Sequence, residues 1–156
     1  MHVLERGGAG YIGSHVVLAL RESGYHVIVL DNLSTGKREL VPGDVAFVEG
    51  DVGDRELTER VIERFDNQRR DSFAGSIVVR ETVGNPLEYC RNNTCVSRSL
   101  IASCVSKGVR QPRFMGTRLS FRSRRIMPTI PMNPYGASKL MTEWILRDAA
   151  TAHDLT

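Results

Sequence analysis

The sequence predicts an α/β fold in which helices cover both faces of a parallel sheet, a doubly wound arrangement. The first observation is a glycine-rich stretch, Gly7-Gly8-Ala9-Gly10-Tyr11-Ile12-Gly13, between a short apolar start and a helical pattern over 16–20. The second is an apolar run over 25–30 that ends in Asp31. The third is the alternation of apolar runs with helical patterns further along, which favours parallel strands joined by crossover helices.

The composition indicates a globular chain with one core. Its 156 residues are 41% hydrophobic and 25% charged, which excludes a disordered chain. The net charge of +3 is too small to indicate nucleic-acid binding, and the basic excess gathers at 110–125. The three cysteines have no metal-type spacing and indicate reduced thiols. Reduced thiols, together with the lack of a run long enough to cross a membrane, lead us to expect a cytoplasmic protein. The cysteine spacing leads us to expect no metal site.

The glycine-rich stretch and Asp31 together predict a dinucleotide-binding site. Glycines let the strand-to-helix turn close tightly and let a diphosphate approach the backbone. The helix that follows presents N–H groups and the positive end of its dipole to the phosphates. Asp31 stands near the offset at which an acid binds the adenosine ribose hydroxyls. An ordinary tight turn with a surface Asp is the alternative, which the order of the elements disfavours.

The remaining elements are predicted in chain order. A loop with a short helical turn covers 31–44, and 45–50 is a third strand. Asp54 is the expected N-cap of a helix, and Gly108 is the expected C-cap of a longer helix that opens at 86. The helix after Asp54 has the apolar positions Leu57, Val61, Ile62 and Phe65. A last helix follows Pro134.

The spacing Gly7-x-x-Gly10-x-x-Gly13 resembles the short-chain dehydrogenase/reductase superfamily. With 30–36 (Leu-Asp-Asn-Leu-Ser-Thr-Gly) and 133–139 (Asn-Pro-Tyr-Gly-Ala-Ser-Lys), nearly the whole chain resembles one branch of it, the UDP-glucose 4-epimerases. The resemblance implies a Rossmann-type domain over 1–156 with NAD as its cofactor. The residues that it implies at NAD are Gly7, Gly10, Tyr11, Ile12, Gly13, Asp31, Asn32, Leu33, Ser34, Thr35, Gly36, Asp51, Val52, Phe73, Ala74, Gly75, Asn92, Tyr135 and Lys139.

Tyr135 and Lys139 are the predicted catalytic residues. Four positions apart on a helix, they lie on one face. A tyrosine is normally too weak an acid to act as a base at neutral pH, but a lysine cation and the nicotinamide cation beside it favour the phenolate. The phenolate can take the proton of a sugar hydroxyl as hydride passes to the cofactor. A surface pair is the alternative, which the surrounding motif disfavours.

The implied activity is an isomerase of galactose metabolism that interconverts UDP-glucose and UDP-galactose by transient oxidation at C4. Family members are roughly twice as long and carry a C-terminal sugar-nucleotide domain, which we expect to be absent from these 156 residues. They pair as homodimers through helices that would include 85–107 and 134–150. Two other readings stay open: a sibling nucleotide-sugar epimerase or dehydratase, and a non-catalytic nucleotide-binding fragment.

Two stretches, 67–72 and 111–130, depart from the family pattern. The fold requires a buried strand near each, but the first would bury two arginines and an aspartate, and the second becomes a basic run. The family's catalytic Ser or Thr therefore has no assigned position, because Thr117 and Ser120 stand outside its motif.

Glu5 and Arg6 are a smaller departure, at the end of the first strand. A central parallel strand should be apolar on both faces, and the family pattern has a small apolar residue and a Thr at these two positions.

Compensated frameshifts are our hypothesis for the two departing stretches. Read one nucleotide earlier, codons for 110–116 can spell Ala-Ala-Val-Tyr-Gly, the family motif at that place. Read one nucleotide later, codons for 67–73 can spell an apolar strand that runs into Phe73. We therefore expect low order or unsatisfied polar groups there, a weakly folded polypeptide and no measurable epimerase activity. Resequencing the DNA tests this, and clean in-frame codons for both stretches would refute it.

Overall fold

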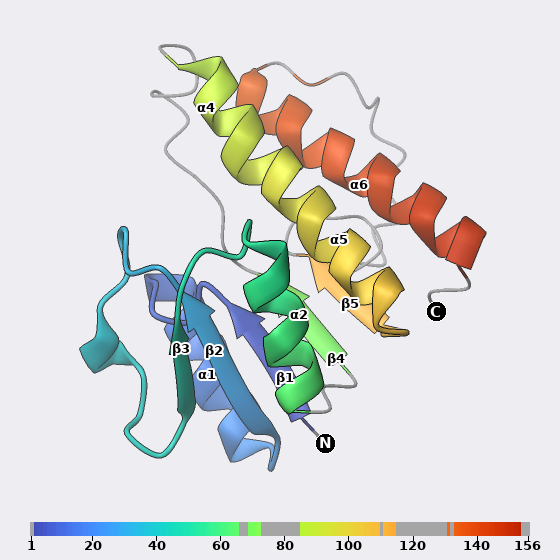
Figure 1. Ribbon diagram of the computed structural model, residues 1–156. Helices are drawn as coiled ribbons and strands as arrows, with labels where there is room; N and C mark the ends of the chain where they lie inside the picture. Colours follow the sequence, from blue (N-terminus) through green and yellow to red (C-terminus); the bar gives the residue numbers. More distant parts are fainter. Residues whose placement is uncertain are drawn as a thin grey trace.

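The computed structural model describes residues 2–65, 69–72, 85–109, 111–114, 131 and 133–153, and side chains within 2–65, 85–87, 90–109, 131 and 133–153. Five parallel strands form one sheet in the order β3-β2-β1-β4-β5 (Figure 1). They are β1 (His2–Arg6), β2 (His26–Asp31), β3 (Ala46–Glu49), β4 (Arg69–Ser72) and β5 (Gln111–Phe114). The order reverses at the junction of β1 and β4, and such a reversal is where doubly wound sheets bind ligands.

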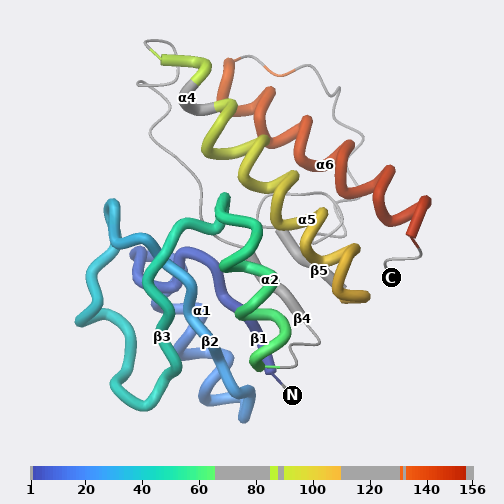
Figure 2. The backbone as a smooth tube through the Cα atoms, viewed as in Figure 1, coloured from blue at the N-terminus to red at the C-terminus, as the bar shows by residue number. Residues whose placement is uncertain are grey.

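Helices cover the two faces of this sheet, as the sequence predicts. Helix α1 (Tyr11–Glu22) joins β1 to β2. Figure 2 shows the backbone running from β2 to β3 and then, through α2 (Arg55–Arg64), back toward β4. A short 3-10 turn, η1 (Arg38–Leu40), precedes β3. Helix α4 (Pro86–Cys90), a π turn, η2 (Arg91–Cys95), and α5 (Val96–Ser106) form one long rod beside α6 (Pro134–His153) (Figure 1).

The core has two parts because successive residues of a strand point to opposite faces of the sheet. On the α1 side, Val17 packs with Val27 and Val29 of β2. On the other side, Leu4 of β1 and the alternate β2 residues pack with α2, α5 and α6. The buried members of that cluster are Leu4, Ile28, Leu30, Val52, Val61, Ile62, Leu100, Ile101, Cys104, Val109 and Leu146. Strand β2 is therefore apolar on both faces from Val27 to Leu30, as a buried parallel sheet requires, whereas β1 is apolar only at Val3 and Leu4.

Local signals in the sequence set the helix ends correctly. The side chain of Asp54 accepts a hydrogen bond from the N–H of Leu57 at 3.0 Å and caps α2. Gly108, with φ of +65°, ends the long rod, and the next N–H, of Val109, donates back to the carbonyl of Cys104 at 2.9 Å. The prediction of Asp54 as N-cap is confirmed. The C-cap of the rod is Lys107, one residue before the predicted Gly108, which takes the left-handed position just after the cap.

Within the stretches 67–72 and 111–130, where the fold requires strands but the side chains do not suit them, the backbone of 69–72 and 111–114 does form strands. Strand β4 pairs in parallel with β1, and β5 pairs with β4. Backbone N–H and C=O groups make these ladders whatever the side chains are, and β1 would otherwise leave one side unpaired. Pro112 lacks a donor, but β5 is the last strand in the order, where proline is tolerated. The side chains of both strands, and the expected buried charges with them, lie outside the described residues.

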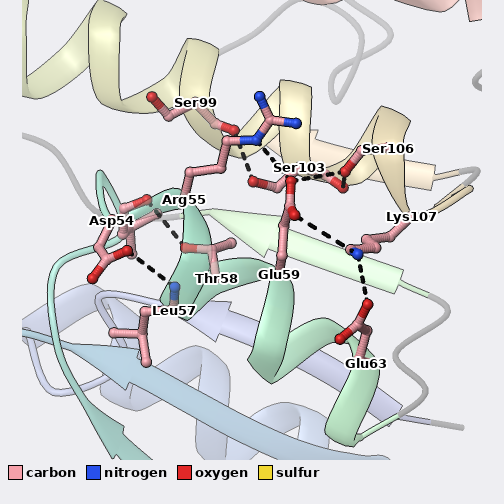
Figure 3. A network of polar contacts seen from close by, with 11 residues as sticks. Asp54, Arg55, Leu57, Thr58, Glu59, Glu63, Ser99, Ser103, Ser106 and Lys107 are labelled. Atoms are coloured by element: carbon pink, nitrogen blue, oxygen red, sulfur yellow. Dashed lines mark hydrogen bonds and ion pairs between the residues drawn. The ribbon is translucent and has the colours of Figure 1, made fainter.

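A polar network ties the rod to α2 (Figure 3). The carboxylate of Glu59 accepts hydrogen bonds from Arg55 at 2.7 Å and from Ser106 of α5 at 3.0 Å, and Lys107 bonds to Glu63. The hydrogen bond from Arg55 lowers the pKa of Glu59, and the hydrogen bond to Glu63 raises the pKa of Lys107. Pairs exposed to solvent in this way add little to stability, so the network mainly sets how α5 lies on α2.

Candidate cofactor site and active site

The turn between β1 and α1 is built by its glycines. Gly7 has φ of +76°, in the left-handed region that favours glycine. Its N–H donates to the carbonyl of Leu30 at 3.0 Å, and its carbonyl accepts from the N–H of Gly10 at 3.0 Å. A Cβ on Gly13 would lie 2.1 Å from the Gly7 oxygen. The first turn of α1 therefore rests directly on the backbone of the loop before it.

The N-terminus of α1 faces the carboxyl ends of the strands. Its N-cap, Gly10, is extended and makes no side-chain capping bond, so the first N–H groups keep no side-chain acceptor. Tyr11, with 79% of its surface exposed, and Ile12, with 38%, lie beside this end. Both are predicted cofactor residues, and their exposure leaves them accessible to a ligand.

Asp31 ends β2 and lies 8% exposed beneath the glycine turn. One carboxylate oxygen accepts from the N–H of Ala9 at 3.0 Å, and the other accepts from the N–H of Leu33 at 2.8 Å. A carboxylate has about four acceptor positions, so two remain for the hydroxyls of a ribose. The predicted ribose ligand is therefore also a brace between the turn and the loop after β2.

The loop 32–36, predicted to contact the cofactor, lies against the same turn. Leu33 has φ of +55°, a left-handed conformation that the bond to Asp31 holds in place. A Cβ on Gly36 would come within 2.8 Å of the carbonyl carbon of Ala9, so only glycine fits there. Ser34 donates its N–H to the side chain of Asn32, and Ser34 and Thr35 are exposed.

Asp51 and Val52 follow β3 on the same edge of the sheet. The Asp51 carboxylate lies 3.5 Å from the amide nitrogen of Asn32 and accepts from the N–H of Gly53 at 2.6 Å. Val52 is buried in the core. The two loops predicted to hold the adenosine end of the cofactor are thus brought together.

Tyr135 and Lys139 lie on one face of α6, as predicted, with the ammonium nitrogen of Lys139 5.6 Å from the Tyr135 ring centre. Asn133 starts this helix by accepting from the N–H of Gly136 at 2.8 Å, and Pro134 occupies the first helical position. Burial, and to a lesser degree the positive charge of Arg6, lowers the pKa of Lys139.

A buried polar clamp joins α6 to the π turn. The side-chain amide of Asn93 donates to the hydroxyl of Ser138 at 3.1 Å, and that hydroxyl donates to the carbonyl of Tyr135 at 2.7 Å. Thr94 donates to the Ser138 carbonyl at 3.2 Å, and Thr142 donates to the Asn93 carbonyl at 3.2 Å. Because every member is buried and bonded, the clamp fixes the turn of α6 that carries Tyr135.

Glu5 and Arg6 are buried at the end of β1, where the sequence analysis expected apolar residues. Glu5 is fully buried and Arg6 is 4% exposed. Burial lowers the pKa of Arg6 to about 10, and the negative charges of Asp51 and then Glu5 oppose that effect. Arg6 therefore stands within the electrostatic reach of both Asp51 and Lys139, at the centre of the site.

The structure brings together most of the predicted site. Asn92 lies half-buried on the π turn. Phe73, Ala74, Gly75, Thr117 and Ser120 lie outside the described residues. Sequence reasoning did not assign Arg6, Asn93 or Ser138 to the site, although a polar residue at a core position of a strand or helix is a usable signal for each. Within the described ranges, no cluster of metal-ligating side chains and no helix able to cross a membrane is found.

Residues 4–156 match the NAD dependent epimerase/dehydratase family. The chain belongs to this family. It is 48% identical over 159 residues to a UDP-glucose 4-epimerase of Azospirillum brasilense, an alignment that covers 98% of this chain and 46% of that protein. The family members that it matches are thus about twice the length of this chain.

Solved structures of family members share the fold. The UDP-glucose 4-epimerase of Thermus thermophilus in complex with NAD has a TM-score of 0.91 at 35% identity, over 99% of this chain and 52% of that one. The Brucella ovis enzyme, also in complex with NAD, has a TM-score of 0.89 at 36% identity, over 99% of this chain and 49% of that one. The predicted Rossmann-type fold is confirmed.

The residues of this epimerase-family site fit a dinucleotide. The turn is closed by glycines whose positions a Cβ would fill, the first N–H groups of α1 have no side-chain cap, and Asp31 retains acceptor capacity beside them. The glycine turn would hold the diphosphate, Asp31 the adenosine ribose, and Tyr135 and Lys139 the nicotinamide end.

Proposed function

We propose that this chain is the NAD-binding part of a UDP-glucose 4-epimerase that interconverts UDP-glucose and UDP-galactose. The observation that carries the proposal is the Tyr135–Lys139 face of α6, held by the clamp at the sheet edge where Asp31 and the glycine turn also lie. The 48% identity to the Azospirillum brasilense enzyme supports the choice of substrate.

Each residue has a separate task in this reaction. When bound, NAD would supply the hydride acceptor for C4 of the sugar and the hydride donor for the opposite face of the keto sugar. Tyr135 takes the proton of the C4 hydroxyl and gives it back, and the ammonium group of Lys139 favours the phenolate that does so. The clamp holds the backbone of Tyr135 through its carbonyl. A fixed backbone helps to position the hydroxyl, since proton transfer needs an approach of about 2.6–3.2 Å between heavy atoms.

The experiment uses the 156-residue chain and a chimera in which it replaces the matching half of the Azospirillum brasilense enzyme. We expect the chain alone to bind NAD without turning over UDP-galactose, since it matches only 46% of the Azospirillum brasilense enzyme, and the chimera to do both. A chain that binds NAD, with an inactive chimera, would favour the alternative of a non-catalytic nucleotide-binding fragment. A chimera that acts on another nucleotide sugar would favour a sibling epimerase or dehydratase.

Cofactor choice is a further prediction. Asp31→Ala should weaken NAD binding about 10- to 100-fold, the value of one lost hydrogen bond to a charged group, and should remove the preference for NAD over NADP. The preference is lost because the carboxylate no longer repels the 2′-phosphate. Calorimetric titration with both dinucleotides measures this. The control is Asp44→Ala, an exposed aspartate paired with Arg21; an unchanged preference in Asp31→Ala would contradict the assignment.

A further inference from the structure

We propose that Arg6 binds the diphosphate of the dinucleotide, as a cationic contact beneath the glycine turn. This inference rests on the proposed function, because it assumes that the site at the carboxyl ends of the strands takes a dinucleotide. It concerns a residue at which this chain departs from its family pattern.

The sheet order puts Arg6 at the centre of the site. It is the last residue of β1, which lies between β2 and β4 where the order reverses. It pairs with Leu30 of β2, and Gly7 of the phosphate-binding turn follows it directly. A ligand laid across the carboxyl ends of a doubly wound sheet passes over this point.

The side chain leaves β1 on the face that carries α6. Leu4, two residues earlier and so on the same face, packs in the cluster that includes Leu100 of α5 and Leu146 of α6. The positive charge of Arg6 acts on Lys139 and is itself acted on by Asp51. Asp51 follows β3 and Lys139 lies on α6, so Arg6 lies between the adenosine end and the nicotinamide end of the predicted site.

The chemistry of the arginine side chain selects a diphosphate. A guanidinium offers five N–H donors in a rigid fork that matches phosphate oxygens, and it stays charged at neutral pH. Burying that charge is costly; Asp51 and Glu5 offset part of the cost, and a phosphate with matching acceptors would offset more of it. Arg6 and the N-terminus of α1 then both offer donors and positive charge where the dinucleotide carries its negative charge.

The test measures binding of three probes to the 156-residue chain: NAD, ADP and adenosine. Arg6→Thr should weaken NAD and ADP by at least about 10-fold, since a hydrogen bond to a charged group contributes about 1.5–3 kcal/mol, and should leave adenosine within about twofold. Arg6→Lys keeps the positive charge but loses the forked donors, so its affinity for NAD and ADP should lie between those of the unchanged chain and Arg6→Thr. Arg60→Thr makes the same change on the exposed side of α2 and should alter no affinity.

The outcomes separate this inference from the proposed function. If the unchanged chain binds neither NAD nor ADP, both fall. If it binds them and Arg6→Thr binds them equally well or more tightly, only the role of Arg6 is overturned; tighter binding would mean that Arg6 obstructs the cofactor. An equal loss of adenosine affinity would mark a general loss of structure and would also overturn it.

A second readout does not depend on cofactor binding. The chain has three lysines, Lys37, Lys107 and Lys139, so 13C-methylated side chains can be followed individually by NMR. Lys139 should titrate below Lys107, and Arg6→Thr should raise the pKa of Lys139 while Lys107 stays in place. An unmoved Lys139 would show that Arg6 does not lie in this site.

Discussion

Replacing Tyr135 with phenylalanine is expected to lower UDP-galactose turnover by the chimera about 10²- to 10⁴-fold, the usual contribution of a general acid–base group. The change removes one hydroxyl and keeps the ring, which lies 5.6 Å from the ammonium of Lys139. NAD should remain bound because the glycine turn and Asp31 are untouched. Steady-state turnover and the ratio of bound NAD to protein are the two measurements.

Tyr25→Phe is the matched control, because Tyr25 packs against the α1 side of the core, away from α6. It should keep both turnover and NAD. Full turnover by the Tyr135→Phe chimera would remove tyrosine from the mechanism. Loss of NAD together with turnover would show that the hydroxyl serves binding rather than proton transfer.

Replacing Gly13 with alanine should abolish measurable NAD binding and destabilise the chain by about 1–3 kcal/mol or more, the range for overpacked sites. The new Cβ would lie 2.1 Å from the Gly7 oxygen, 2.8 Å from the Gly7 carbonyl carbon and 2.9 Å from the Gly8 Cα. All three are backbone atoms, so no side-chain rotation relieves the contact. Helix α1 must move away from the turn, which separates the N–H groups that converge on the diphosphate.

Calorimetric titration with NAD and a thermal unfolding curve measure the two effects. Gly43→Ala is the control: nothing lies within 4 Å of its Cβ position, so neither quantity should change. If Gly13→Ala binds NAD with unchanged affinity, the close contact between turn and helix is not what shapes the phosphate site.

The parts of this site that depend on local pattern could be predicted from the sequence. The glycine spacing, the acid at the end of β2 and the i,i+4 pair on α6 each lie within one element or one turn. Their geometry follows from strand, turn and helix periodicity, and the structure places them as expected.

The parts that depend on distant partners could not. The amide of Asn93 meets Ser138 across 45 positions of the chain, and nothing near either residue signals the other. The charge of Arg6 acts on Lys139, which lies on α6 far along the chain, and no local pattern signals that the two are close. The side-chain pattern of 67–72 did not indicate strand β4, because it says nothing of the backbone groups of β1 that need a paired neighbour.

The π turn at Arg91–Cys95 has a consequence for how this family member can change length. Each residue of an α-helix advances the chain by about 100° around its axis, so the wider turn sets a fixed angular offset between the helix before it and the helix after it. The Asn93 side chain, on the π turn, bonds to Ser138 of α6. The side chains of Leu100 and Cys104, on the helix after the turn, pack in the core against the sheet. Removing one residue here would rotate the two directions against each other by about that angle. With a shortened turn, the rod can therefore keep either the hydrogen bonds of the clamp or the packing of the core, but not both. The two sets of contacts together fix the number of residues in the turn.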